Sequence, residues 1–172
     1  MENSLIGIII LFLSFYFLLF LYHFFKTNNA KKVGYEILKS FSGTNLSRIE
    51  IQFSETRYSG TLTLGGNYSK ATMYYSDRIL IFIQNDNSYF GSINNSLPLI
   101  ISTEYHGLGE VSYKDVKRIT IKSDEYILDI SKSVQEKRLK IYSEKENNTL
   151  KNIFNSFQEI LNQKTDCTTA AL

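Results

Sequence analysis

The sequence has little of the residues on which several kinds of protein chemistry depend. Its 172 residues include one cysteine, one proline, two histidines and no tryptophan. The single cysteine, Cys167, excludes an intrachain disulfide and any metal site built on several thiolates. Neither His23 nor His106 has a second histidine or cysteine at the spacing that zinc ligands require. We therefore expect no metal and no cofactor.

A catalytic set is also missing from the pattern. Nucleophilic catalysis by serine or cysteine needs a base beside the nucleophile, and His106 lies in a glycine-containing loop where a solvated histidine is expected. Asp124 and Glu125 fall in a turn, as solvated loop charges do. Gly65-Gly66 is not followed by the Lys-Ser/Thr step of a phosphate loop. The sequence predicts a protein that is not an enzyme.

An excess of charge of either sign is absent too. The chain has 19 lysines and arginines against 17 aspartates and glutamates, a formal net charge of +2. So small an excess does not indicate a nucleic-acid partner. The chain is rich instead in aromatic and small polar residues, with 12 tyrosines, 12 phenylalanines and many asparagines, serines and threonines. Aromatic residues favour strands and the small polar residues favour turns, so the composition indicates mostly β structure.

Charged residues and proline are missing altogether from the run Leu5 to Phe25. As a helix rising ~1.5 Å per residue, this run is about 31 Å long, close to the ~30 Å thickness of the bilayer hydrocarbon. It therefore predicts one transmembrane helix within residues 1–26. The membrane-spanning positions are represented by Leu5, Ile10, Phe15, Phe20 and Phe25.

The flanks of this run indicate an uncleaved anchor and its orientation. A secretory signal peptide begins with basic residues and ends in small ones, whereas this chain begins with Met1-Glu2 and ends the run in aromatic residues. Lys26, Lys31 and Lys32 follow the run, and only Glu2 and the terminal amine precede it. The positive-inside rule then predicts a cell-membrane protein whose C-terminal domain is cytoplasmic.

The remaining chain divides into a connection, one domain and a tail. Residues 27–47 are expected to be a polar linker, Thr27–Lys32, followed by a short amphipathic helix, Val33–Phe41. Residues 48–163 have the usual size of a single domain. Residues 164–172 are expected to be a disordered tail.

Within the domain, apolar residues alternate with polar ones in a series of short segments typical of strands. The expected strands begin with Arg48–Ser54 and Tyr58–Leu64, and a hairpin joins Ala71–Tyr75 to Ile79–Ile83. Five further short strands are expected in 97–103, 111–113, 119–121, 126–130 and 138–142. From Asn148 or Thr149 the period changes to that of a one-sided helix, with apolar positions at Leu150, Ile153, Phe154, Phe157, Ile160 and Leu161. The fold class is α+β and mostly β: a partly open antiparallel barrel of about seven strands, capped by a C-terminal helix.

Three segments carry a family resemblance. Gly60–Leu64, Met73–Phe82 and Val111–Ile119 resemble the strand-turn-strand pattern of bacterial pleckstrin-homology-like and GRAM-like domains. The resemblance covers roughly Arg48 to Gln163, and it implies a barrel closed by a last helix. Lipid-binding members concentrate basic residues in the loop that joins the first strands. The corresponding loop here has only Lys70, so the resemblance does not imply phosphoinositide recognition by that route.

The basic residues of the last strands are candidates for contact with an anionic surface. They are Lys114, Lys117, Arg118, Lys122, Lys137, Arg138 and Lys140. Acidic residues interleave with them, which is also the pattern of an ordinary solvated face. The leading hypothesis is a single-pass, membrane-anchored, non-catalytic module that binds a protein partner or the adjacent membrane. The alternative is an exported, membrane-anchored β-barrel that binds an apolar ligand.

Overall fold

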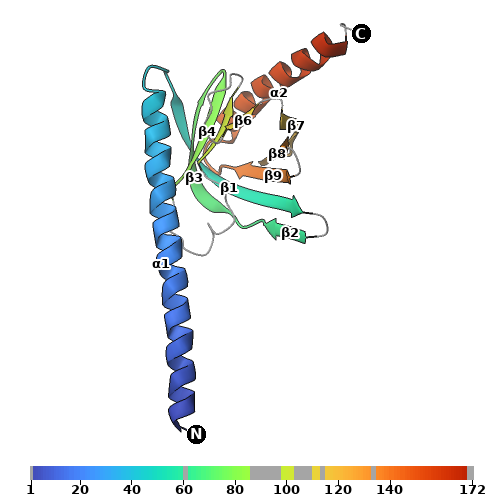
Figure 1. Cartoon of the computed structure of the whole chain (residues 1–172). Coiled ribbons are helices and arrows are strands. Elements are labelled where there is room, and N and C mark those ends of the chain that lie inside the picture. The colour runs from blue at the N-terminus through green and yellow to red at the C-terminus, as the bar shows by residue number, and fades with distance from the viewer. Residues whose placement is uncertain are drawn as a thin grey trace.

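The computed structural model describes residues 2–59, 62–85, 98–102, 110–112, 115–132 and 135–169. Its longest element is one helix, α1 (Glu2–Ser40), which continues without a break from the apolar run into the domain (Figure 1). The prediction of a linker at Thr27–Lys32 followed by a separate helix was therefore wrong. This segment contains neither glycine nor proline, and its helix continues into residues that pack on the domain, so helical hydrogen bonding continues across its polar residues.

Nine strands follow α1 within the described residues. They are β1 (Ser47–Ser59), β2 (Leu62–Gly65), β3 (Ser69–Ser76), β4 (Ile79–Gln84), β5 (Leu99–Ser102), β6 (Glu110–Ser112), β7 (Val116–Ile121), β8 (Glu125–Lys132) and β9 (Gln135–Tyr142). The chain ends in helix α2 (Asn147–Thr169).

Seven of the strands form a continuous antiparallel sheet in the order β5-β4-β3-β1-β9-β8-β7. Strand β6 extends the β5 edge in parallel, and β2 folds back on the end of β1. The long strand β1 pairs with β3 through its first half and with β9 through its second half, which curls the sheet into a half-barrel (Figure 1). The expected architecture is thereby confirmed.

The main core lies on the concave face of this half-barrel. Phe53 and Phe82 meet there with their ring centroids 5.5 Å apart, and α2 covers the face with side chains that are all buried. These helix residues are Leu150, Ile153, Phe154 and Phe157. The one-sided pattern of the C-terminal helix therefore identified its packing surface correctly.

A second, smaller core lies on the outer face of the sheet, under the C-terminal part of α1. Ile37 of α1 packs there against Ile79, Ile81 and Ile83 of β4, together with Ile100 of β5. Gly34 makes this approach possible, because a Cβ atom at that position would lie 3.0 Å from Cγ2 of Ile83. The helix is thus seated on the domain and is more than a tether to it.

Several boundaries differ from those expected. Tyr58 belongs to β1, which runs on to Ser59 because β9 pairs with it as far as Tyr58. Helix α2 begins at Asn147 and continues to Thr169, so the part of the expected tail that the structure describes is helical. Strand β6 is parallel to its neighbour, which the run of short strands did not indicate.

Candidate interaction surfaces

A groove of about 510 Å³ runs along strand β7 between this strand and α2. Val116 to Ile121 form one wall, and Gln158, Leu161 and Asn162 form the other. Among the residues that the structure describes, strand β7 is the last in the sheet order, and its pairing with β8 accounts for one side of its backbone. In an antiparallel ladder every second residue directs its N–H and C=O away from the paired neighbour. This edge can therefore accept a further strand.

Three of the basic residues proposed from the sequence gather at this edge. Lys117, Arg118 and Lys122 are all exposed, and the Nζ of Lys117 lies 3.3 Å from Oε1 of exposed Glu136. Among the described residues, Arg118 and Lys122 have no ion-pair partner. The Lys117–Glu136 pair is exposed at both ends, and such a pair contributes little to stability. Lys114 lies outside the described residues. Within the described part of the chain, the edge therefore presents two exposed cations, Arg118 and Lys122, outside any ion pair.

Two basic residues of β9, Arg138 and Lys140, form ion pairs with carboxylates. Nε of Arg138 lies 2.7 Å from Oδ1 of Asp129, and its guanidinium carbon lies 5.8 Å from the centroid of the Tyr58 ring. Its hydrogen bond with Asp129 raises the pKa of Arg138 further. The Nζ of Lys140 lies 3.5 Å from Oε1 of Glu125. These cations are engaged with carboxylates of the neighbouring strand, so the predicted basic set is divided between two environments.

Lys137 points to the inside of the half-barrel, where it meets a carboxylate that the sequence pattern did not single out. Glu55 is 1% exposed, and its Oε1 lies 2.7 Å from Nε of Arg57 and 3.4 Å from Nζ of Lys137. A signal for it was present in the sequence. Glu55 continues the inward parity of Ile51 and Phe53, because side chains alternate between faces along a strand.

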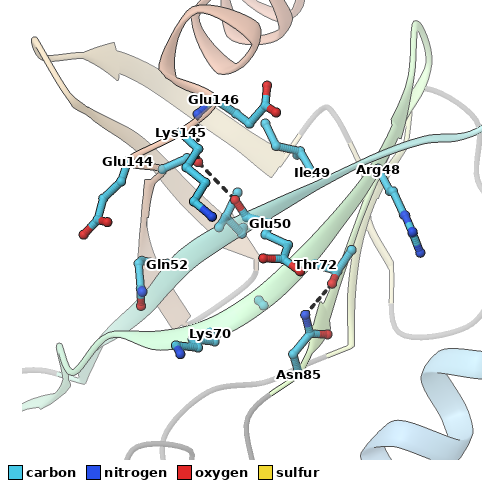
Figure 2. Close-up of a pocket in the computed structure, with 13 residues that line it drawn as sticks. Arg48, Ile49, Glu50, Gln52, Lys70, Thr72, Asn85, Glu144, Lys145 and Glu146 are labelled. Carbon is cyan, nitrogen blue, oxygen red and sulfur yellow. Dashed lines mark hydrogen bonds between the residues drawn. The ribbon is translucent and has the colours of Figure 1, made fainter.

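A second groove, of about 640 Å³, lies on the outer face between β1–β3 and the segment that leads into α2. Figure 2 shows its polar lining, in which Nδ2 of Asn85 donates to Oγ1 of Thr72 at 2.5 Å. The hydroxyl of Ser143 donates to the carbonyl oxygen of Glu50 at 3.0 Å. This hydrogen bond holds the segment between β9 and α2 against β1. The lining carries both signs of charge, from three basic and three acidic residues: Arg48, Lys70, Lys145, Glu50, Glu144 and Glu146. This mixture favours no particular ligand.

Tyr68 links two distant parts of the sheet, since its hydroxyl donates to Oε1 of Glu125 across 57 residues of sequence. Burial, the hydrogen bond and the negative charge of Glu125 all raise the pKa of Tyr68 above its ordinary value. The phenol therefore keeps its proton to a higher pH than an ordinary tyrosine does. No sequence pattern joined these two residues.

Neither chemistry nor similarity identifies the domain further. Within the described residues, no group of three or more histidines, cysteines, aspartates and glutamates is arranged to hold a metal ion. The two histidines fall outside the described side chains. A scan against models of known protein families found no match, and no curated protein matched the chain.

Helix α1 has the composition of a membrane span. It is the one helix in the described part of the chain that is long and apolar enough to cross a bilayer, and the apolar window lies wholly outside the folded core. Ile10, Phe15, Phe20 and Phe25 are all exposed, while the side chain of Leu5 lies outside the described set. An exposed helix of this kind fits a membrane anchor or a signal sequence.

Proposed function

We propose that this protein is a single-pass, membrane-anchored interaction module of pleckstrin-homology-like type that holds a protein-binding surface at the cytoplasmic face of the membrane. The observation that carries the proposal is the continuity of α1. One helix contains the apolar run and also Ile37, which is buried against β4. Cleavage after the apolar run would cut this helix in its middle and leave residues 26–40 on the domain, whereas the uninterrupted helix joins the seated Ile37 directly to the apolar run. This continuity supports an anchor over a removed signal sequence.

Partner binding is assigned to the β7 edge. A β-bulge at Lys117, where the pairing register shifts, leaves Arg118 to Ile121 as the regular part of the edge. Extended peptides bind such edges through main-chain hydrogen bonds, and neighbouring side chains supply the specificity. The exposed cations Arg118 and Lys122 favour an acidic segment, while basic residues and a bulge discourage indiscriminate pairing of the edge.

The alternative of a β-barrel that carries an apolar ligand is less well supported. Phe154 and Phe157 of α2 are buried in the main core on the concave face, where such a ligand would have to lie. An interior occupied by side chains agrees better with a module that works through its surface. This domain is proposed to act without catalysis.

Membrane anchoring is tested by extraction and by accessibility. The full-length protein should remain in the membrane pellet after carbonate washing and should enter the soluble fraction only with detergent. A protease added to intact cells should leave the domain uncut, and cleavage from outside would show the opposite topology. Release by carbonate alone would contradict the anchor.

Strand addition is tested with a defined peptide on the full-length protein in detergent. The probe is a fluorescent ten-residue peptide that alternates valine and glutamate, compared with a valine and lysine peptide and with one methylated at alternate backbone nitrogens. We expect the acidic peptide alone to bind, and Arg118→Glu to weaken its binding by about tenfold or more, because it sets a carboxylate against the glutamates of the peptide and like charges at an interface repel. Arg48→Glu, an exposed matched control on β1, should bind normally. Equal binding of the methylated peptide, or no effect of Arg118→Glu, would contradict strand addition at β7.

A further inference from the structure

The seating of α1 on β4 fixes the height of the domain above the membrane. If the hydrocarbon ends near Phe25, Gly34 lies about 13 Å beyond it, at ~1.5 Å of rise per residue. The headgroup layer occupies about 5–7 Å on each side of the hydrocarbon core. Since Gly34 faces Ile83 directly, the side chain of Ile83 lies a short distance above the headgroups.

Strand β4 then leads back toward the bilayer. Figure 1 shows the β3–β4 turn level with the C-terminal end of α1, so β4 runs antiparallel to the helix. The two residues from Ile83 to Asn85 cover about 7 Å of extended chain, which brings Asn85 down to headgroup height. The backbone N–H of Asn85 donates to the carbonyl oxygen of Lys70 at 3.0 Å. The exposed Lys70 therefore lies at the same level.

The charges at this level match an anionic lipid surface. With the same rise per residue, Lys26 of α1 lies at the hydrocarbon boundary, and Lys31 and Lys32 lie about 9–10 Å beyond it, just outside the headgroup layer. Lys70 adds a fourth cation from the domain itself. Basic residues close to a bilayer surface are attracted to anionic headgroups. The attraction and the helix seating thus act in the same direction, which is to hold this edge of the domain against the membrane.

We infer that the domain lies on the bilayer in one fixed orientation, with the start of β3 and Asn85 resting on anionic lipid headgroups. This inference rests on the membrane anchor proposed above and adds the surface that the domain turns toward the lipid. The β3–β4 turn at Arg78 then faces away from the membrane. Strand β7, at the other end of the sheet from the strands under α1, is left accessible from the side.

The experiment measures the height of single sites above the lipid. Full-length protein with Cys167→Ser receives one nitroxide label, either at Lys70→Cys or at Arg78→Cys, and is placed in nanodiscs that contain phosphatidylserine. Both positions are exposed, so labelling should leave the fold intact. Collision with nickel chelated to lipid headgroups should be severalfold more frequent at Lys70→Cys than at Arg78→Cys.

A break in the helix provides the control. Asn28→Pro removes a backbone donor and kinks α1 between the span and the domain, whereas Asn28→Ala keeps the helix. We expect the difference between the two labels to collapse with proline and to persist with alanine. Equal collision at both sites in the unbroken protein, or a difference that survives Asn28→Pro, would overturn the fixed orientation. If the full-length protein does not enter nanodiscs, the anchor itself is wrong and this inference fails with it.

Discussion

Gly34 and Ile83 meet where helix α1 crosses the outer face of the sheet. A Cβ atom added at Gly34 would lie 3.0 Å from Cγ2 and 3.3 Å from Cδ1 of Ile83. Separations under about 3.4 Å are closer than ordinary van der Waals contact between carbon atoms. The glycine thus allows α1 to approach β4 closely, and this contact joins the apolar run to the domain.

Enlarging this glycine should separate the helix from the sheet. We expect Gly34→Leu to lower the free energy of unfolding by about 1–3 kcal/mol, the usual effect of overpacking. Urea unfolding followed by circular dichroism in detergent measures it. Gly7→Leu is the control, because nothing lies within 4 Å of a Cβ there. Ile83→Ala should recover part of the loss in the Gly34→Leu background, and no recovery would place the strain elsewhere.

The hydroxyl of Tyr126 should stabilise the start of α2. It donates to the backbone oxygen of Asn147 at 2.9 Å or to its Oδ1 at 2.5 Å, and the Tyr126 ring stacks on Phe154 with centroids 5.0 Å apart. Tyr126→Phe keeps the stacking and leaves a partly buried acceptor unsatisfied, so we expect a loss of about 1–2 kcal/mol in thermal unfolding. Tyr75→Phe, at a partly buried tyrosine of β3, should cost less. An equal loss in both variants would argue against the hydrogen bond.

The buried carboxylate of Glu55 should depend on its two cations unequally. Its 2.7 Å contact with Arg57 is shorter than its 3.4 Å contact with Lys137. We therefore expect Arg57→Leu to destabilise the domain more than Lys137→Met, by up to about 3 kcal/mol, because removing one partner leaves a buried charge poorly compensated. Glu136→Gln, at the exposed pair with Lys117, should change stability little. Urea midpoints rank the three variants, and a larger effect of Lys137→Met would contradict the geometry.

Alkaline pH should weaken the domain through Tyr68. Its pKa in the folded protein is raised above the ordinary value of 10.0, so the unfolded chain loses the phenolic proton first as pH rises. The contribution of Tyr68 is therefore complete below about pH 10 and is lost above it. Tyr68→Phe should make stability fall less steeply above pH 10, while Tyr35→Phe, at an exposed tyrosine of α1, should retain the steep fall. Identical slopes in the two variants would contradict the link to Glu125.

Much of the architecture could be predicted because the spacing of apolar residues along the chain differs between strands and helices. The alternation around Ile49, Ile51 and Phe53 gave a strand and its inward face, and the 3.6-residue spacing from Leu150 to Phe157 gave the packing side of α2. The pattern could not give strand partners. The return of β2 onto β1 and the parallel pairing of β6 depend on which edges meet in three dimensions.

The candidate surface could be predicted only in its parts. The sequence indicated that Lys117, Arg118 and Lys137 are basic and near strands, yet the fold sends Lys137 inward to Glu55 and leaves Arg118 at an exposed edge. Which cations remain available depends on the parity and neighbours of each strand. Those neighbours lie far away in the chain, as Glu55 does from Lys137.

The apolar run from Leu5 to Phe25 was determined by sequence alone, because a charge-free stretch of that length is a property of composition. Tertiary structure decided the conformation of the residues after this run. The polar stretch Thr27–Lys32 has the composition of a linker until β4 presents Ile79, Ile81 and Ile83 as a surface on which Ile37 is buried. That packing keeps α1 helical through Ser40, since burial of an apolar face stabilises a helix more than the local propensity of a few residues opposes it.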